Sequence, residues 1–171
     1  MKKEETIDEV LFRIIEKNSE TKAVVMELLS SYPDNFIHGF FEPLVETDWV
    51  DSDILVAFDG KEAIGSIMFN RKNNEYNWLV VKKGTRFSKS EVAKKLFEYF
   101  YPSVPVGTPV HFFVNTEDSS FSPTPSFTGK SFEPARRLYR SMGLEMSESN
   151  RIENHYGPGA HVYKVEWVPN P

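Results

Sequence analysis

The chain has 171 residues and a formal net charge of −5, and this length is typical of one globular domain. Hydrophobic residues make up 40% of it and charged residues 26%, a balance that excludes a disordered chain. The negative charge disfavours a dedicated nucleic-acid-binding protein, and the absence of cysteine excludes disulfides, zinc–thiolate sites and cysteine nucleophiles. No apolar stretch approaches the roughly 18 residues of a membrane span, and the charged first residues do not match a secretory signal. We therefore expect a cytoplasmic protein that binds neither a membrane nor nucleic acid.

The first third of the chain predicts one strand and two helices. A strand is expected over residues 10–16, after which Asn18 begins a helix that ends near Ser30. A second, less regular helix is expected over residues 35–46, where Pro43 disturbs the pattern. Its aromatic side chains fit either a core face or the wall of a substrate cleft.

A β-hairpin and a further strand follow. Residues 54–69 predict the hairpin, because glycine in the Asp59-Gly60 turn supplies the positive φ that a tight turn needs. The next strand is expected over residues 75–81. Its end, residues 78–81, is continuously apolar, which indicates that both faces of the strand are covered.

A cationic loop joins that strand to a helix expected over residues 89–100. Four cations lie within eight residues at the helix start: Lys82, Lys83, Arg86 and Lys89. Unpaired N–H groups at such a helix start favour a phosphate or pyrophosphate group. Ser88 and Glu91 also match a capping box, so local hydrogen bonding explains the loop without any ligand.

The last third predicts a strand over residues 110–114 and a long loop over residues 116–131, rich in Ser, Thr, Pro and Gly. A helix follows over residues 132–142, with Ser131 as its cap and Gly143 as its stop. Its arginines are expected to form a solvated face: Arg136, Arg137 and Arg140.

Two strands, near residues 144–153 and 160–168, close the chain. The order of the elements predicts a mixed α/β domain with no internal boundary. The histidines show no metal-ligand spacing, so we expect no metal: His38, His111, His155 and His161.

Two segments carry a family resemblance. Residues 75–81, an acidic residue followed by Trp and aliphatic residues, resemble the fourth strand of the GNAT acetyltransferases. The helix that contains Ala135 and Tyr139 and ends at Gly143-Leu144 is similar to the family's alanine–tyrosine–glycine–phenylalanine helix, with leucine in place of phenylalanine.

The resemblance covers about residues 52–168 and implies one GNAT-like domain over residues 1–171. That fold has a central, mostly antiparallel sheet of six to seven strands, flanked by about four helices. The implied activity is transfer of an acetyl group from acetyl-CoA to a primary amine of a small molecule or peptide, by direct attack of the amine. A preference for longer acyl groups stays open.

The resemblance also implies where the coenzyme binds. The pantetheine arm would add to the edge of the strand at residues 79–81, and the pyrophosphate would lie on the helix start. The residues assigned to the coenzyme are Leu79, Val80, Val81, Arg86, Ser88, Lys89, Ser90, Glu91, Val92, Ala93 and Asn115.

The pyrophosphate loop departs from the family pattern at two positions. Ser88 replaces a Gln or Arg, and Glu91 replaces the first Gly, whereas Ala93 fits. Because a carboxylate repels a phosphate, Glu91 weakens coenzyme binding. The alternative function is therefore a GNAT-fold binding or regulatory module in which acetyl-CoA binding is weakened or lost.

The resemblance also implies a general acid and a general base for catalysis. Tyr139 would protonate the departing thiolate, and Glu75 would accept the proton of the amine. A surface carboxylate without any catalytic role is an equally good explanation of Glu75. Other candidates for the base are Glu46, Asp48 and His111.

The acceptor is expected to touch residues 35–50 and 116–131. These segments have an acidic bias: Asp48, Asp51, Asp53, Glu117 and Asp118. That bias favours a cationic acceptor, either a small amine or a lysine-bearing peptide. Monomer and homodimer both remain open.

Overall fold

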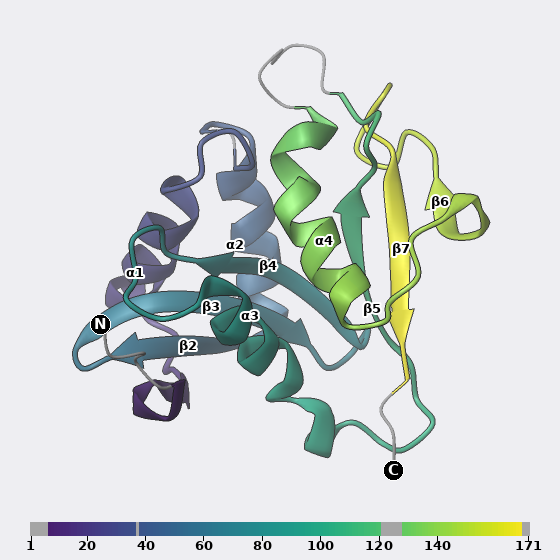
Figure 1. Cartoon of the computed structure of the whole chain (residues 1–171). Coiled ribbons are helices and arrows are strands. Elements are labelled where there is room, and N and C mark those ends of the chain that lie inside the picture. The colour runs from purple at the N-terminus through teal and green to yellow at the C-terminus, as the bar shows by residue number, and fades with distance from the viewer. Residues whose placement is uncertain (1–6, 37, 121–127, 169–171) are drawn as a thin grey trace, which may run out of the picture. The chain divides into compact units, whose positions relative to one another are not determined.

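The computed structural model describes residues 7–36, 38–120 and 128–168, and the chain divides into two compact units, Met1–Val104 and Pro105–Pro171 (Figure 1). Within the described residues the two units together contain seven strands and four α-helices. The mixed α/β class is confirmed, and each strand pair described below is antiparallel. None of the helices in these ranges has the length and apolar character of a membrane span.

The first unit is a four-stranded antiparallel sheet in the order β1–β2–β3–β4, with three helices. The strands are β1 (Leu11–Ile14), β2 (Asp53–Asp59), β3 (Glu62–Asn70) and β4 (Glu75–Val81). The helices are α1 (Ser19–Ser30), α2 (Phe41–Asp51) and α3 (Lys89–Glu98), with the 3-10 turns η1 (Ile7–Glu9) and η2 (Tyr101–Ser103).

The helices of this unit cover both faces of its sheet (Figure 1). On one face, side chains of α1 and α2 form a core with Ile54, Val56, Met68 and Val80. On the other face α3 approaches so closely that a Cβ on Gly65 would lie 3.2 Å from the Leu96 side chain. The central strands β2, β3 and β4 are therefore covered on both faces, as the apolar run at residues 78–81 predicted for β4.

α3 packs against the sheet through a cluster of aromatic side chains. Tyr76 of β4 lies with its ring 4.8 Å from Phe97 and 4.9 Å from Phe69 of β3, and Phe69 lies 4.9 Å from Phe100. The predicted apolar face of this helix is confirmed, because Val92, Leu96, Phe97 and Phe100 are all buried.

Several local predictions for this unit are confirmed. Asn18 caps α1 in a full capping box with Thr21, and Gly60 takes φ 60° in the β2–β3 turn. The second helix was placed wrongly: α2 begins at Phe41 rather than near residue 35. Pro43 lies in its first turn, where the ring costs no intrahelical hydrogen bond, so the proline does not disturb the helix.

The second unit is a three-stranded antiparallel sheet in the order β5–β7–β6, with one helix. Its elements are β5 (Val110–Asn115), η3 (Gly129–Phe132), α4 (Glu133–Ser141), η4 (Glu148–Asn150), β6 (Arg151–Ile152) and β7 (Val162–Trp167). Tyr139 of α4 packs on Phe112 of β5 at 4.5 Å, and Gly143 at φ 80° follows the helix end, as expected.

Three expectations for this unit are corrected. The helix cap is Phe132, whose side chain makes no cap bond, because the Ser131 hydroxyl donates to the Thr128 carbonyl instead. The strand expected near residues 144–153 is only the two-residue β6. Arg136 is buried, at 2% exposure, rather than solvated. Within the long loop, Ser120 and Thr128 form an isolated antiparallel bridge, and residues 121–127 lie outside the described residues.

Candidate functional site

A β-bulge interrupts β4 in the first unit. Ser66 pairs with Val80 but Met68 pairs with Asn77, so Ile67 of β3 faces two residues, Trp78 and Leu79. Trp78 takes φ 57°, a left-handed conformation that is rare for a bulky side chain. Such local strain is held only where the surroundings enforce it, and it concentrates at functional sites.

The bulge changes the direction of the Trp78 side chain. Regular alternation would place Trp78 on the α3 face of the sheet, beside Tyr76. Instead its ring lies 5.8 Å from Phe36 and 6.4 Å from Phe41, and it packs against the core under α1 and α2. Its indole Nε1 donates to Oδ2 of Asp48 on α2 at 2.7 Å. Asp48, one of the predicted alternative bases, therefore lies at the bulge.

A second contact occupies the end of β4. The Lys82 N–H donates to the Ile64 carbonyl at 2.7 Å, and antiparallel alternation then directs the Val81 carbonyl away from β3. The Tyr32 hydroxyl, whose pKa burial raises, donates to this carbonyl at 2.5 Å. The carbonyl keeps a second lone pair for another donor.

Residues at the start of α3 satisfy some of the backbone N–H groups of its first turn. The Ser88 hydroxyl accepts from the Glu91 N–H at 3.4 Å, and the Val92 N–H donates to the Ser88 carbonyl at 3.0 Å. Among the described residues the Ser88 N–H makes no hydrogen bond to the Glu91 carboxylate, so the predicted capping box is only half formed. The N–H groups of Lys89 and Ser90 remain at the helix start.

The residues assigned to the coenzyme at this helix start differ in accessibility. Ser88, Lys89, Ser90 and Glu91 are exposed. Val92 and Ala93 are buried and pack in the α3 core, so any coenzyme contact they make passes through the backbone.

Two of the four cations in the loop are already paired. Arg86 donates to both carboxylate oxygens of Asp59 at 2.9 Å and to Glu9 at 3.0 Å, and its bonds to Asp59 lower the pKa of that carboxyl. Lys82 pairs with Glu62. Within the described ranges, Lys83 and Lys89 make no ion pair, and the Lys83 ammonium lies 4.5 Å from the Tyr32 ring centre. The loop therefore carries less free positive charge than its sequence suggested.

Glu75 lies at the start of β4, opposite Asn70. With its nitrogen directed toward Glu75, the Asn77 side-chain amide donates to Oε1 at 3.1 Å. Three residues, about 10 Å of extended strand, separate Glu75 from Trp78. Of the other candidate bases, Glu46 is ion-paired with Lys22 on the surface.

The remaining predicted site residues belong to the second unit. Tyr139 is 7% exposed, and burial raises the pKa of its hydroxyl, which keeps it protonated near neutral pH. Asn115 accepts from the Ser119 hydroxyl at 3.2 Å, and its carbonyl accepts from the Arg136 guanidinium at 2.7 Å. Burial lowers the pKa of His111, which keeps the ring neutral.

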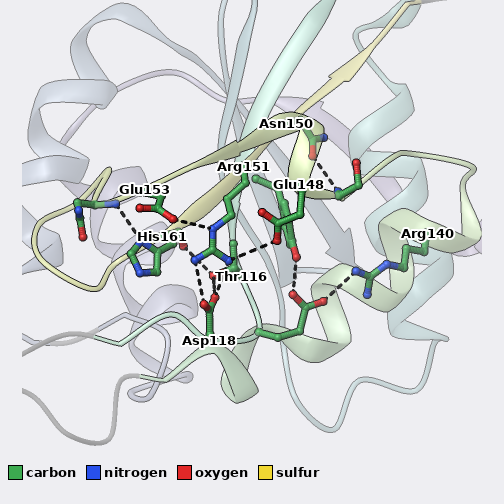
Figure 2. A network of polar contacts seen from close by, with 12 residues as sticks. Thr116, Asp118, Arg140, Glu148, Asn150, Arg151, Glu153 and His161 are labelled. Carbon is green, nitrogen blue, oxygen red and sulfur yellow. Dashed lines mark hydrogen bonds and ion pairs between the residues drawn. The ribbon is translucent and has the colours of Figure 1, made fainter.

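Arginines neutralise both acidic residues of the long loop. Arg151 donates to both oxygens of Asp118 at 3.0 and 2.9 Å, which lowers the pKa of that carboxyl (Figure 2). Glu117 accepts from Arg140 at 2.9 Å and from the Tyr163 hydroxyl at 2.6 Å. Burial raises the pKa of Glu117, but these hydrogen bonds outweigh it and lower the value to about 2.

Because of these ion pairs, fewer acidic side chains are available to attract a cationic acceptor than the sequence suggested. Asp53 is also paired, with Arg71 at 2.5 Å. Of the five acidic residues that pointed to a cationic acceptor, Asp48 and Asp51 are the two without a cationic partner in the described part of the chain. Across the same residues, no group of three or more potential ligands is placed to hold a metal ion.

No protein-family model matches the chain, and no curated protein matches its sequence. Solved structures do match. An aminoglycoside 6'-N-acetyltransferase from Enterococcus faecium is 16% identical, with a TM-score of 0.64 over 94% of this chain and 98% of that one. An aminoglycoside 6'-N-acetyltransferase complexed with coenzyme A gives the same four values.

A GNAT-family acetyltransferase from Staphylococcus aureus Mu50 is 18% identical, with a TM-score of 0.56 over 91% of this chain and 97% of that one. Identities this low establish architecture rather than activity. The resemblance noticed in the sequence is thus confirmed at the level of the fold: the chain has the fold of the GNAT acetyltransferases.

Proposed function

We propose that this protein is an N-acetyltransferase that moves an acetyl group from acetyl-CoA to a primary amine of a small molecule or peptide. The bulge at Trp78 and Leu79 carries the proposal, because it breaks the β3–β4 ladder in a chain whose fold is that of acetyltransferases. The neighbour complexed with coenzyme A supports the donor, and the aminoglycoside enzymes support a small amine as acceptor. We place the protein in the cytoplasm as a monomer or homodimer.

The coenzyme would use two parts of the first unit. The β4 backbone from Leu79 to Val81 would bind the pantetheine amides as an added strand does. The N–H groups of Lys89 and Ser90, with the free Lys89 ammonium, would bind the pyrophosphate at the start of α3. Glu91 is exposed, so its carboxylate has room to turn toward solvent.

Starting from the ammonium form of the acceptor, the reaction removes two protons from the nitrogen and supplies one to the CoA sulfur. An amine with a pKa of about 10.4 is unprotonated in only about one molecule in 2,500 at pH 7. Glu75 would accept the ammonium proton, directly or through water, and the free amine would attack the thioester carbon. Backbone N–H groups near Leu79 would stabilise the oxyanion. As the C–S bond breaks, Tyr139 would donate its proton to the departing CoA thiolate, and the second nitrogen proton would pass to the resulting phenolate, directly or through water.

Titration calorimetry with acetyl-CoA tests the proposal. Binding in the micromolar range supports it. The absence of heat at millimolar coenzyme contradicts it and favours the alternative, a GNAT-fold binding or regulatory module. Two observations favour that alternative: Glu91 at the start of α3, and the ion pairs that hold Arg86.

A further inference from the structure

Asp48 of α2 accepts a hydrogen bond from a neutral side-chain donor, the Trp78 indole. Elsewhere on the helix, Glu46 pairs with Lys22, and Glu42 contacts the His38 ring and the Gly39 N–H. Asp48 is half-buried, and among the hydrogen bonds of the described residues it uses only Oδ2, to the indole of Trp78. One oxygen and one full negative charge are therefore available to a ligand.

The partner residue adds a second feature that cations prefer. Trp78 is half-buried and lies against the half-buried ring of Phe36 at 5.8 Å, with a tilt of 47° between the rings. The faces of aromatic rings attract cations, and tryptophan does so most strongly. The indole N–H donates to the Asp48 carboxylate at 2.7 Å, so the negative charge and the aromatic side chain lie next to each other.

From this juxtaposition we infer that Asp48 and Trp78 form a binding site for an alkylammonium group, and that this is where the cationic acceptor amine is recognised. The second clause rests on the proposed acetyltransferase function, whereas ammonium binding itself does not. The site explains why the chain tolerates a left-handed Trp78: the bulge brings the indole to α2. Asp48 acts as an anchor for the acceptor, and Glu75 keeps the role of base.

Ammonium binding can be measured without coenzyme. Benzylammonium is the cationic probe, and benzyl alcohol is its neutral analogue. The readout is the indole N–H signal of Trp78 in a ¹H–¹⁵N NMR spectrum, assigned by its loss in Trp78→Phe. We expect millimolar benzylammonium to shift this signal, benzyl alcohol to leave it in place, and added salt to weaken the effect. Equal shifts with both probes, or none with either, would overturn the inference.

A pair of matched variants tests the charge. Asp48→Asn keeps the acceptor oxygen for the Trp78 N–H but removes the negative charge. Asp51→Asn removes an exposed carboxylate from the same helix. We expect Asp48→Asn to weaken benzylammonium binding about tenfold or more, and Asp51→Asn to change it less than about twofold. Equal effects of the two variants would contradict a specific site.

Kinetics then link the site to the proposed function. With an amine acceptor, Asp48→Asn should raise the acceptor KM about tenfold and leave calorimetric binding of acetyl-CoA unchanged. If wild-type protein binds benzylammonium but no acetyl-CoA, the site stands and the acetyltransferase proposal fails. If it binds acetyl-CoA and transfers to amines while Asp48→Asn leaves the acceptor KM unchanged, the acceptor site is overturned and the proposed function stands.

Discussion

The Tyr32 hydroxyl donates to the Val81 carbonyl at 2.5 Å, across 49 residues of sequence. This bond ties the end of α1 to the end of β4, at a carbonyl that the GNAT resemblance assigns to pantetheine. Since a coenzyme amide would approach the same oxygen, the two donors compete or share its lone pairs.

Removing the Tyr32 hydroxyl should lower the stability of the fold without weakening coenzyme binding. Tyr32→Phe loses one part-buried hydrogen bond, so the free energy of unfolding should fall by about 0.5–1.5 kcal/mol. Acetyl-CoA should bind as tightly as to wild type or several-fold more tightly, because the carbonyl is free. Urea denaturation and calorimetry measure the two effects. Weaker coenzyme binding would show instead that Tyr32 helps to hold the coenzyme.

Glu91 is the departure from the family pattern that bears most on coenzyme affinity. Glu91→Gln removes the charge and keeps a good helix former, so acetyl-CoA affinity should rise by about 1 kcal/mol. Glu91→Gly should give a similar gain, and helix stability should fall by up to about 1 kcal/mol more than in the glutamine variant. Thermal shift with and without acetyl-CoA reads both effects. If Glu91→Gly lowers the melting temperature and acetyl-CoA raises it no more than in wild type, the start of α3 is only a helix cap and does not bind the coenzyme.

Gly65 is required by the close approach of α3 to β3. A Cβ there would lie 3.0 Å from the Val80 carbonyl oxygen, 3.2 Å from Leu96 and 3.4 Å from Val92. Gly65→Ala should therefore lower the free energy of unfolding by about 1–3 kcal/mol. Combining it with Leu96→Ala should cost less than the sum of the single changes, because the shorter side chain makes room. Strict additivity in urea denaturation would rule out this clash.

Acid should destabilise the second unit through Glu117. Its pKa is lowered to about 2 in the folded protein from an ordinary value of 4.5. The unfolded chain therefore takes up the proton first, and the stabilisation that is full above pH 4.5 is lost as the pH falls toward 2. Glu117→Gln should flatten the stability profile in this window.

The pKa of Asp118 is lowered too, from an ordinary value of 3.8, so its window overlaps that of Glu117 and only part of the acid sensitivity should disappear in Glu117→Gln. Glu16→Gln is the control, because Glu16 makes no ion pair among the described residues. A pH profile unchanged by Glu117→Gln would contradict the role of the Arg140 and Tyr163 bonds.

The sequence predicts those features that depend on local chemistry. The Gly60 turn, the Asn18 cap and the bounds of β4 follow from turn, capping and hydrophobic patterns of a few residues. The start of α2 was misplaced, because a proline in the first turn resembles a proline that breaks a helix.

Features that depend on residues distant in sequence were missed. The bulge at Trp78 depends on the register between β3 and β4, which no composition pattern encodes, although the break in alternation at residues 78–81 is a signal compatible with it. The Trp78–Asp48 bond joins residues 30 positions apart, and the Arg140–Glu117 pair joins residues 23 apart. Charge counted along the sequence therefore overestimated the free acidic surface.

Release of the CoA thiol tests the central claim most directly. The chain contains no cysteine, so a thiol reagent detects free CoA without any background from the protein. With acetyl-CoA and benzylamine together, we predict thiol release that requires both substrates, yields N-acetylbenzylamine, and falls at least about tenfold in Glu75→Gln and in Tyr139→Phe. No release above the uncatalysed rate, across a panel of cationic, neutral and peptide amines at saturating acetyl-CoA, would contradict the account.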